Sequence, residues 1–278
     1  QLHLLTRGDR TAPTRQRSLR ALVDWSYDLC TEEERMMWQR ASVFAGGFDL
    51  AAAEGVCTDG AVRVGDVVDL LDQLVSKSII VAETGSRTVR FRLLETLRQY
   101  GFERLDEAGA ADRFLAAHRD HYLALADDVL ASWSTEQQSA GIAVLRTEQV
   151  NFARALEWSF TTPGQERRGV HLVTALRFHW AIGGFLRQGR RWLDIALASS
   201  SDSFPEIGTA LWVASWVALC QGDRRSADDY LDRADRLVER REDRRLDIYV
   251  RLMRGSAALF RSDVDEAVDL LESANGDL

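Results

Sequence analysis

Few residues in this sequence have the types and spacing that catalysis or metal binding requires. His118 and His121 stand three positions apart in a predicted helix, so both rings could face one metal ion. No further carboxylate or cysteine stands beside them at ligand spacing, whereas protein zinc sites use three or four such ligands. We therefore interpret the pair as incidental and expect no metal site.

Motifs of nucleophilic and phosphate-binding enzymes are also absent from the sequence. No serine stands in a G-x-S-x-G turn, and no G-x-x-x-x-G-K-[ST] loop is present to hold nucleotide phosphates. The many carboxylates are spread over predicted helix faces, which is typical of solvated charge. We predict that the chain is not an enzyme and that it binds no cofactor itself.

Composition and charge narrow the class of protein further. A formal net charge of -8, from 43 acidic and 35 basic residues, argues against a general binder of nucleic acids or anionic membranes. Cys30, Cys57 and Cys220 are an odd number and lie far apart, which favours neither a disulfide framework nor a zinc site. The sequence has no apolar run of membrane-spanning length and no secretory signal. We expect a cytoplasmic protein.

The first third of the chain shows the pattern of a winged-helix domain. Helical spacing and caps predict helices at 18–30, 31–44, 50–57, 65–76 and 94–108, and alternation predicts strands at 78–83 and 88–93. The first helix carries its apolar residues at Leu19, Leu22, Val23 and Leu29. The inward face of the fourth helix is predicted to be Val67, Val68, Leu71, Leu74 and Val75. We place this domain at residues 18–108, after a linker at 1–17 that follows a missing upstream module.

The rest of the chain, residues 109–278, shows an internal repeat. Gly222-Asp223 with Ala227, Leu231 and Ala234 matches Ser262-Asp263 with Ala267, Leu271 and Ala274 at an offset of 40 residues, and Gly189, Leu193 and Ala196 give a third copy. Small residues around a leucine allow close helix contact, as in tetratricopeptide hairpins, whose usual period is 34 residues. We predict a mainly α fold with longer helical hairpins, in an array that continues past Leu278.

Several stretches of the sequence resemble one family of regulators. Leu19–Leu29, Val43–Phe48 and Arg92–Tyr100 are similar to the segment that follows the nucleotide-binding module in actinobacterial LuxR-type and AfsR-type regulators, members of the STAND class. Gly189–Asp194 resembles the first repeat of their sensor arrays. The resemblance implies a signal-coupling and protein-interaction fragment of a transcriptional regulator, without catalysis of its own.

The same resemblance implies partners and a cofactor outside this chain. ATP or ADP would bind an upstream ATPase domain, and that domain and a protein or small-molecule effector would be the partners. In some STAND winged helices a Met-His-Asp signature touches the nucleotide, and it aligns here with Leu93, Leu94 and Glu95. Leucine cannot donate the hydrogen bond of histidine, so we expect no direct nucleotide contact from this domain.

DNA binding by the winged helix is the alternative function. A helix that reads the major groove needs basic or amide side chains outward, but the candidate reader helix presents Asp66, Asp69 and Asp72. The wing offers Arg87, Arg90 and Arg92, which could contact a phosphate or a partner. The alternative is therefore a free-standing winged-helix DNA-binding protein whose helical tail dimerises or senses a ligand, and we regard DNA binding by this fragment as disfavoured.

The repeats offer a second candidate surface for recognition. In tetratricopeptide arrays the first helix of each hairpin lines the concave surface, which here presents His171, Phe178, Trp212, Trp216, Tyr249 and Leu252. Aromatic side chains on such a surface can anchor a peptide or a small ligand. Tryptophans at helical spacing are also typical of a packed core, so both interpretations stay open at this point.

Overall fold

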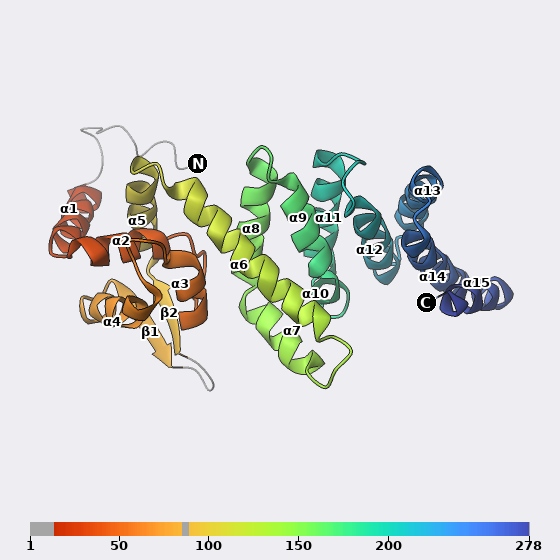
Figure 1. Ribbon diagram of the computed structural model, residues 1–278, viewed down its shortest axis with the longest axis horizontal. Coiled ribbons are helices and arrows are strands. Elements are labelled where there is room, and N and C mark those ends of the chain that lie inside the picture. Colours follow the sequence, from red (N-terminus) through yellow and green to blue (C-terminus); the bar gives the residue numbers. More distant parts are fainter. Residues whose placement is uncertain (1–13, 85–88, 278) are drawn as a thin grey trace. The chain divides into compact units, whose positions relative to one another are not determined.

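A computed structural model describes residues 14–84 and 89–277 of the chain. The chain forms two compact units, residues 1–121 and 122–278. The described residues are mainly α-helical with one short antiparallel sheet, so the predicted fold class is confirmed (Figure 1). The predicted domain boundary between residues 108 and 109 stays a prediction. Within the described ranges, no helix is both long enough and apolar enough to cross a membrane.

The first unit contains every element that the spacing predicts, within a few residues. Its elements are α1 (Thr14–Asp28), α2 (Glu32–Ala41), α3 (Leu50–Cys57), a 3-10 turn η1 (Val64–Asp66), α4 (Val67–Ser76), β1 (Ile80–Thr84), β2 (Val89–Leu93) and α5 (Glu95–Glu107). The helix α6 (Ala111–Ala131) begins in this unit and ends in the next. The capping box at Thr31 and Glu34 is present at the start of α2. Local caps and periodicity therefore determine these elements.

A hairpin and a phenylalanine cluster form one side of the first core. β1 and β2 pair antiparallel with Ile80 opposite Leu93. Phe48 extends this sheet, because its backbone exchanges two hydrogen bonds with Phe91, at N···O distances of 2.9 and 2.7 Å. The Phe48 ring stacks on Phe44 at a centroid distance of 4.3 Å, and both rings are fully buried. The wing is thus joined to the helical core through Phe48.

Contact between α2 and α5 forms the other side of the core of the first unit. Trp38 is fully buried, and its Nε1 donates to the Leu97 carbonyl at 2.9 Å. Gly101 lies against the indole, so close that a Cβ there would stand 2.8 Å from the Trp38 Cδ1. Glycine at this position allows α5 to approach α2 at the indole ring.

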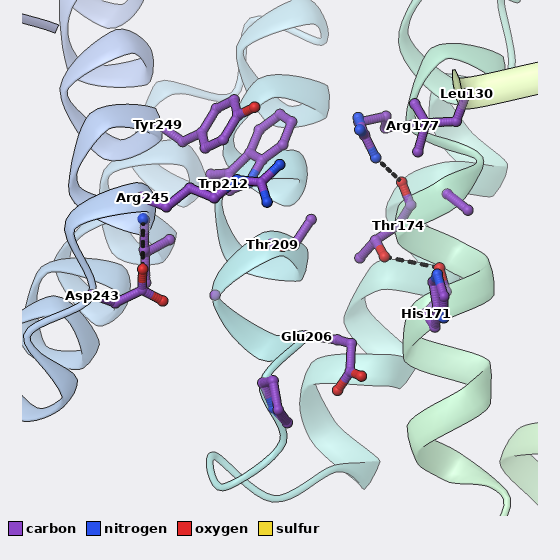
Figure 2. Close-up of a pocket in the computed structure, with 14 residues that line it drawn as sticks. Leu130, His171, Thr174, Arg177, Glu206, Thr209, Trp212, Asp243, Arg245 and Tyr249 are labelled. Atoms are coloured by element: carbon purple, nitrogen blue, oxygen red, sulfur yellow. Dashed lines mark hydrogen bonds between the residues drawn. The ribbon is translucent and has the colours of Figure 1, made fainter. Parts of the chain in front are cut away.

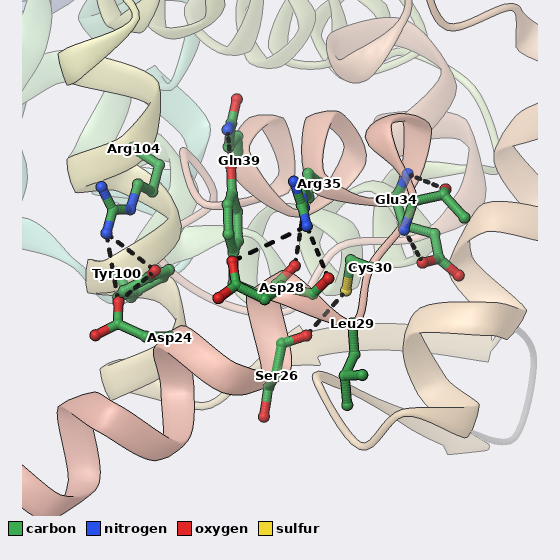
Figure 3. Close-up of polar contacts among 12 residues, drawn as sticks. Asp24, Ser26, Asp28, Leu29, Cys30, Glu34, Arg35, Gln39, Tyr100 and Arg104 are labelled. Atoms are coloured by element: carbon green, nitrogen blue, oxygen red, sulfur yellow. Dashed lines mark hydrogen bonds and ion pairs between the residues drawn. The ribbon is translucent and has the colours of Figure 1, made fainter.

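Polar contacts attach α1 to these two helices (Figure 3). The Tyr100 hydroxyl donates to Asp24 Oδ1 at 2.7 Å, and burial together with this bond raises the pKa of Tyr100 to about 12. Arg104 donates to the Tyr100 hydroxyl at 3.1 Å. On α2, Arg35 donates to the carbonyls of Tyr27 and Asp28 at 2.9 and 2.8 Å. These bonds join α1 to both α2 and α5.

The predicted inward face of α4 differs in part from the structure. Val68 is 51% exposed, so its predicted inward orientation is wrong, while Leu70, which was not predicted, is buried. The buried residues of α4 are Val67, Leu70, Leu71 and Leu74, at the spacing of a single helix face, and Val68 lies outside that face. On α1, Val23 is buried, whereas the apolar residues Leu19, Leu22, Trp25 and Leu29 are exposed.

The second unit is a succession of packed helices (Figure 1). After α6 they are α7 (Gln138–Thr147), α8 (Gln149–Thr161), α9 (Glu166–Ala175), α10 (Arg177–Ala181), α11 (Leu186–Ser199), α12 (Ile207–Cys220), α13 (Arg224–Arg241), α14 (Arg244–Arg261) and α15 (Val264–Gly276). The second helices of the repeats bury their small residues, with Ala227, Leu231 and Ala234 fully enclosed. On α11, a Cβ at Gly189 would stand 2.5 Å from the Trp180 Cβ. Small residues thus permit close helix contact, as the repeat pattern predicts.

The helix junctions of the array recur every twenty residues. Gly222, Glu242 and Ser262 have left-handed φ angles of 76°, 52° and 63° and end α12, α13 and α14. Each is followed by an aspartate, Asp223, Asp243 or Asp263, whose side chain accepts a backbone hydrogen bond at the start of the next helix. The 40-residue repeat therefore consists of two halves that share the same helix junction, a left-handed residue followed by a capping aspartate.

These left-handed positions predict opposite effects on stability when glycine is removed at one of them and introduced at another. We expect Gly222→Ala to lower the free energy of unfolding by about 1 kcal/mol, because alanine is strained at a left-handed φ. Ser262→Gly should raise it by roughly 0.5–1 kcal/mol, because relief of that strain exceeds the entropy cost of glycine. Urea denaturation measures both values. As a control, Ser256→Gly inside α14 should be destabilising, and a destabilising Ser262→Gly would contradict the prediction.

Candidate functional site

A cavity of about 340 Å³ opens in the second unit (Figure 2). It is lined from α9, α10, α12 and the start of α14, with one residue from α6 and two from the loop before α12. The lining residues are Leu130, His171, Thr174, Ala175, Arg177, Pro205, Glu206, Gly208, Thr209, Trp212, Asp243, Arg245, Leu246 and Tyr249. The volume is at the lower end of the range for small-molecule pockets.

Three of the six residues predicted for the concave surface meet at this cavity. His171, Trp212 and Tyr249 come from α9, α12 and α14, the first helices of successive hairpins. Trp212 and Tyr249 stack face to face, with ring centroids 4.6 Å apart and an interplanar angle of 5°. Trp212 is 6% exposed, so the same ring belongs to the core and to the lining of the cavity.

The other three predicted residues lie outside the lining. Phe178 stacks on Trp133 at 3.8 Å and meets the edge of Trp216 at 5.8 Å. Trp216 in turn lies 6.5 Å from Trp212, so one series of ring contacts runs from Trp133 to the cavity. Leu252 is half-buried on α14. A role in recognition for these six residues stays a prediction.

The cavity contains a guanidinium that the sequence did not single out. Arg177 is half-buried, and its Nη1 donates to the Thr174 carbonyl at 3.0 Å. The guanidinium carbon lies 5.6 Å from the centroid of the Trp212 ring and 5.5 Å from that of Phe178. Burial lowers the pKa of Arg177, and the positive charge of Arg245 lowers it further. Among the described residues, no carboxylate forms an ion pair with Arg177.

Arg245 and Thr209 add further unused polar groups to the lining. Arg245 is exposed at the start of α14 and extends toward α12 in Figure 2. Within the described part of the chain, neither the Arg245 guanidinium nor the Thr209 hydroxyl has a hydrogen bond or ion pair. The cavity therefore offers two cationic groups and the Thr209 hydroxyl for contact with a ligand.

The acidic and imidazole groups at the cavity are already engaged. His171 Nε2 lies 3.1 Å from Asp127 Oδ1. Glu206 forms an ion pair with Arg167 at 3.0 Å. Asp243 accepts the Leu246 backbone N–H at 3.0 Å as the cap of α14. These contacts engage His171, Glu206 and Asp243, whereas Arg177 and Arg245 have no carboxylate partner among the described residues.

On the predicted wing, two of the three arginines contact their own unit. Arg90 donates to the Gly47 carbonyl at 2.6 Å, and Arg92 pairs with Glu83 at 2.8 Å. Arg87 lies outside the described residues. Asp66, in η1 directly before α4, pairs with Arg63, while Asp69 and Asp72 on α4 are exposed. The candidate reader helix thus presents an acidic surface.

The predicted incidental histidine pair belongs to the first unit. His118 is fully buried and meets the edge of the Phe44 ring at 5.3 Å. His121 packs on Gly55, where a Cβ would stand 2.9 Å from its Nδ1. In the residues that the structure describes, no group of three or more histidine, cysteine or acidic side chains could hold a metal ion. Cys30, Cys57 and Cys220 are free thiols.

Another histidine, which sequence reasoning did not identify, is enclosed in the second unit. His179 on α10 is 1% exposed, and neither ring nitrogen has a hydrogen-bond partner among the described residues. Its ring stacks on Phe185 at 4.2 Å. Burial, with a smaller contribution from the charge of Arg146, lowers the pKa of His179 to about 4. The side chain is therefore neutral at pH 7.

Comparison with known proteins gives a small set of relatives. A Mycobacterium tuberculosis protein named "Putative HTH-type transcriptional regulator" is 38% identical over 194 residues, 70% of this chain and 22% of that protein, and a Mycobacterium bovis protein of the same kind gives the same values. An uncharacterized Mycobacterium tuberculosis protein is 38% identical over 107 residues, 38% of this chain and 27% of its own length. The chain thus spans about a quarter or less of these relatives. No family model and no solved structure matches it significantly.

The enclosed His179 predicts a pH dependence of stability. Its folded-state pKa of about 4 lies below the usual value. The neutral, buried His179 therefore contributes fully to the free energy of unfolding above about pH 6.5, and this contribution is lost as the pH falls toward 4. Over this range the group lowers the free energy of unfolding by up to about 1.4 kcal/mol per pH unit. His179→Phe keeps the ring stack but cannot take up a proton. Urea denaturation across the range should give a flatter curve for the variant, and equal slopes would contradict the assignment.

Proposed function

We propose that this chain is the regulatory and protein-interaction part of a multidomain transcriptional regulator of the STAND class, related to the LuxR and AfsR types. The observation that carries the proposal is the 38% identity over 194 residues to the relative named as a transcriptional regulator. The match covers 70% of this chain but only 22% of that protein, which is consistent with a module inside a larger regulator. In this proposal the chain itself is not catalytic and works in the cytoplasm.

In this proposal the helical repeats bind the effector that carries the signal. The cavity joins the first helices of successive hairpins, and it combines stacked rings with unpaired cations. Aromatic and arginine side chains are the residues that most often dominate recognition energies. An effector that binds α9, α12 and α14 together would favour one spacing of the repeats over another, and a difference in affinity between states is what a switch needs.

In this proposal the winged-helix unit transmits the signal from the repeats to another domain of the regulator. The α1 helix exposes Leu22, Trp25 and Leu29, which are 60%, 63% and 56% accessible. Large apolar side chains gathered on one helix face are typical of a surface that another domain covers. In the proposal this partner is the ATPase domain that precedes the chain in the regulator, and ATP or ADP binds there.

Direct DNA reading by α4 has less support. Asp69 and Asp72 are exposed on the candidate reader helix and would repel phosphates. On the wing, Arg92 is paired with Glu83, so a phosphate would have to displace that carboxylate. Any DNA-binding helix-turn-helix of the regulator is therefore assigned to a part of the protein outside this chain.

The coupling surface predicts a transcriptional effect of a single exposed residue. We expect Trp25→Ser, in the full-length protein in its own host, to change the expression of the regulated genes by about tenfold, because loss of a large interface side chain often costs more than 1 kcal/mol. Transcript profiling measures the change. Val64→Ser is the matched control, since Val64 is 54% exposed in the same unit but lies on η1, outside α1.

Two results would contradict the proposed function. Unchanged transcripts after deletion of the gene would remove the regulatory role. Salt-sensitive binding of the isolated chain to duplex DNA in a mobility-shift assay, weakened by Arg92→Ala, would favour a free-standing DNA-binding protein instead. No shift by the isolated chain, together with a transcriptional effect of Trp25→Ser, is the expected combination.

A further inference from the structure

We propose that the cavity between α9, α12 and α14 binds a small organic anion with a flat ring, whose charged group is held by Arg177 and Arg245. The ligand class is a planar aromatic or heteroaromatic molecule bearing a carboxylate or a phosphate. This inference rests on the proposed function in one respect, because it names the chemistry of the effector that the repeats would receive.

The first support is that two arginines without a carboxylate partner among the described residues line one cavity. The chain has an excess of acidic residues, and at least nine of the nineteen arginines of the second unit form ion pairs with carboxylates. Examples are Arg190 with Asp194 and Asp223, Arg251 with Asp247 and Asp277, and Arg254 with Asp232 and Asp235. Within the described residues, Arg177 and Arg245 have no such carboxylate. Two unpaired cations at one cavity of an acidic protein favour an anionic ligand.

The second support is the environment of Arg177. A guanidinium has five N–H donors, and the described contacts of Arg177 use one of them, on the Thr174 carbonyl. The group is half-buried beside the Trp212 ring and has lost part of its hydration. A planar guanidinium matches the two oxygens of a carboxylate or phosphate, and such a pair is stronger where water is excluded. An anion at this position would restore the interactions that burial removes.

The third support is the polar and aromatic lining around the two cations. The free Thr209 hydroxyl stands on α12, one helical turn before Trp212, and can donate to an anionic oxygen. The Trp212 and Tyr249 rings stack at 4.6 Å and provide an aromatic surface next to the charge. Aromatic rings prefer stacked or edge contacts with other flat rings. The cavity of about 340 Å³ has room for a ligand of one or two rings.

A titration with simple probes tests this assignment on the intact chain. Naphthoate and naphthyl phosphate carry the two possible charged groups, naphthamide is the neutral analogue, and acetate and inorganic phosphate lack the ring. Calorimetry should show one saturable site for naphthoate or naphthyl phosphate, and the better of the two identifies the charged group. We expect naphthamide and the ring-free ions to bind about tenfold more weakly, or not at all.

Variants then locate the site. Arg177→Met and Arg245→Met should each weaken the better probe, with about a tenfold loss for Arg177→Met because that guanidinium is the more enclosed. Arg244→Met is the matched control, since Arg244 precedes Arg245 on α14 but is exposed and paired with Asp277. If circular dichroism shows that Arg177→Met does not fold, the exposed Arg245→Met carries the test.

Several results would overturn the assignment. They are equal affinity for naphthamide and naphthoate, equal affinity for the ring-free ions, unchanged binding in both arginine variants, and no saturable binding of any probe at millimolar concentration. Tighter binding of an acidic peptide than of the naphthyl probes would also overturn it, in favour of a protein partner. If Trp25→Ser alters transcription but no probe binds, only this assignment fails; if a probe binds but the gene controls no transcripts, only the proposed function fails.

Discussion

Close packing around α12 is the constraint on which the second unit depends. This helix is apolar on nearly every side and contacts α9, α10, α11, α13 and α14. A helix that is hydrophobic all round must be enclosed by its neighbours. Gly208, where a Cβ would stand 2.8 Å from the Leu246 Cδ2, lets α14 approach it. Because Thr209 and Trp212 belong to the same helix, the packing that stabilises the repeats also fixes one wall of the cavity.

The sequence predicts where helices and strands occur, but it does not always predict which face of a helix is buried. The Thr31–Glu34 capping box and the alternation at Val89–Leu93 are local signals, and the structure contains both. On α4, by contrast, the run Val67–Ser76 has more apolar residues than one face can hold. Which of them are buried depends on the packing of other helices, so helical spacing alone predicts Val68 inward and does not identify Leu70.

For the cavity too, the sequence predicts some lining residues but not the ones whose role depends on distant partners. His171, Trp212 and Tyr249 were named because aromatic residues and histidine on first helices are visible in sequence. Arg177 was not, because 35 basic residues are present and nothing in a sequence tells which of them lack a carboxylate. That depends on pairings between residues thirty or more positions apart, such as Arg190 with Asp223 and Arg167 with Glu206. The half-repeat at Glu242-Asp243 was missed because glutamate is an unusual residue at a left-handed φ.

The regular junctions at Gly222, Glu242 and Ser262 give successive helices of the array the same length. One residue added between Arg244 and Tyr249 would turn the rest of α14 by about 100° and carry Tyr249 away from Trp212. Duplication of a whole 40-residue hairpin would keep every face in phase and simply lengthen the surface. Such an array can evolve by gaining or losing entire hairpins, whereas single-residue insertions are tolerated mainly at the junctions.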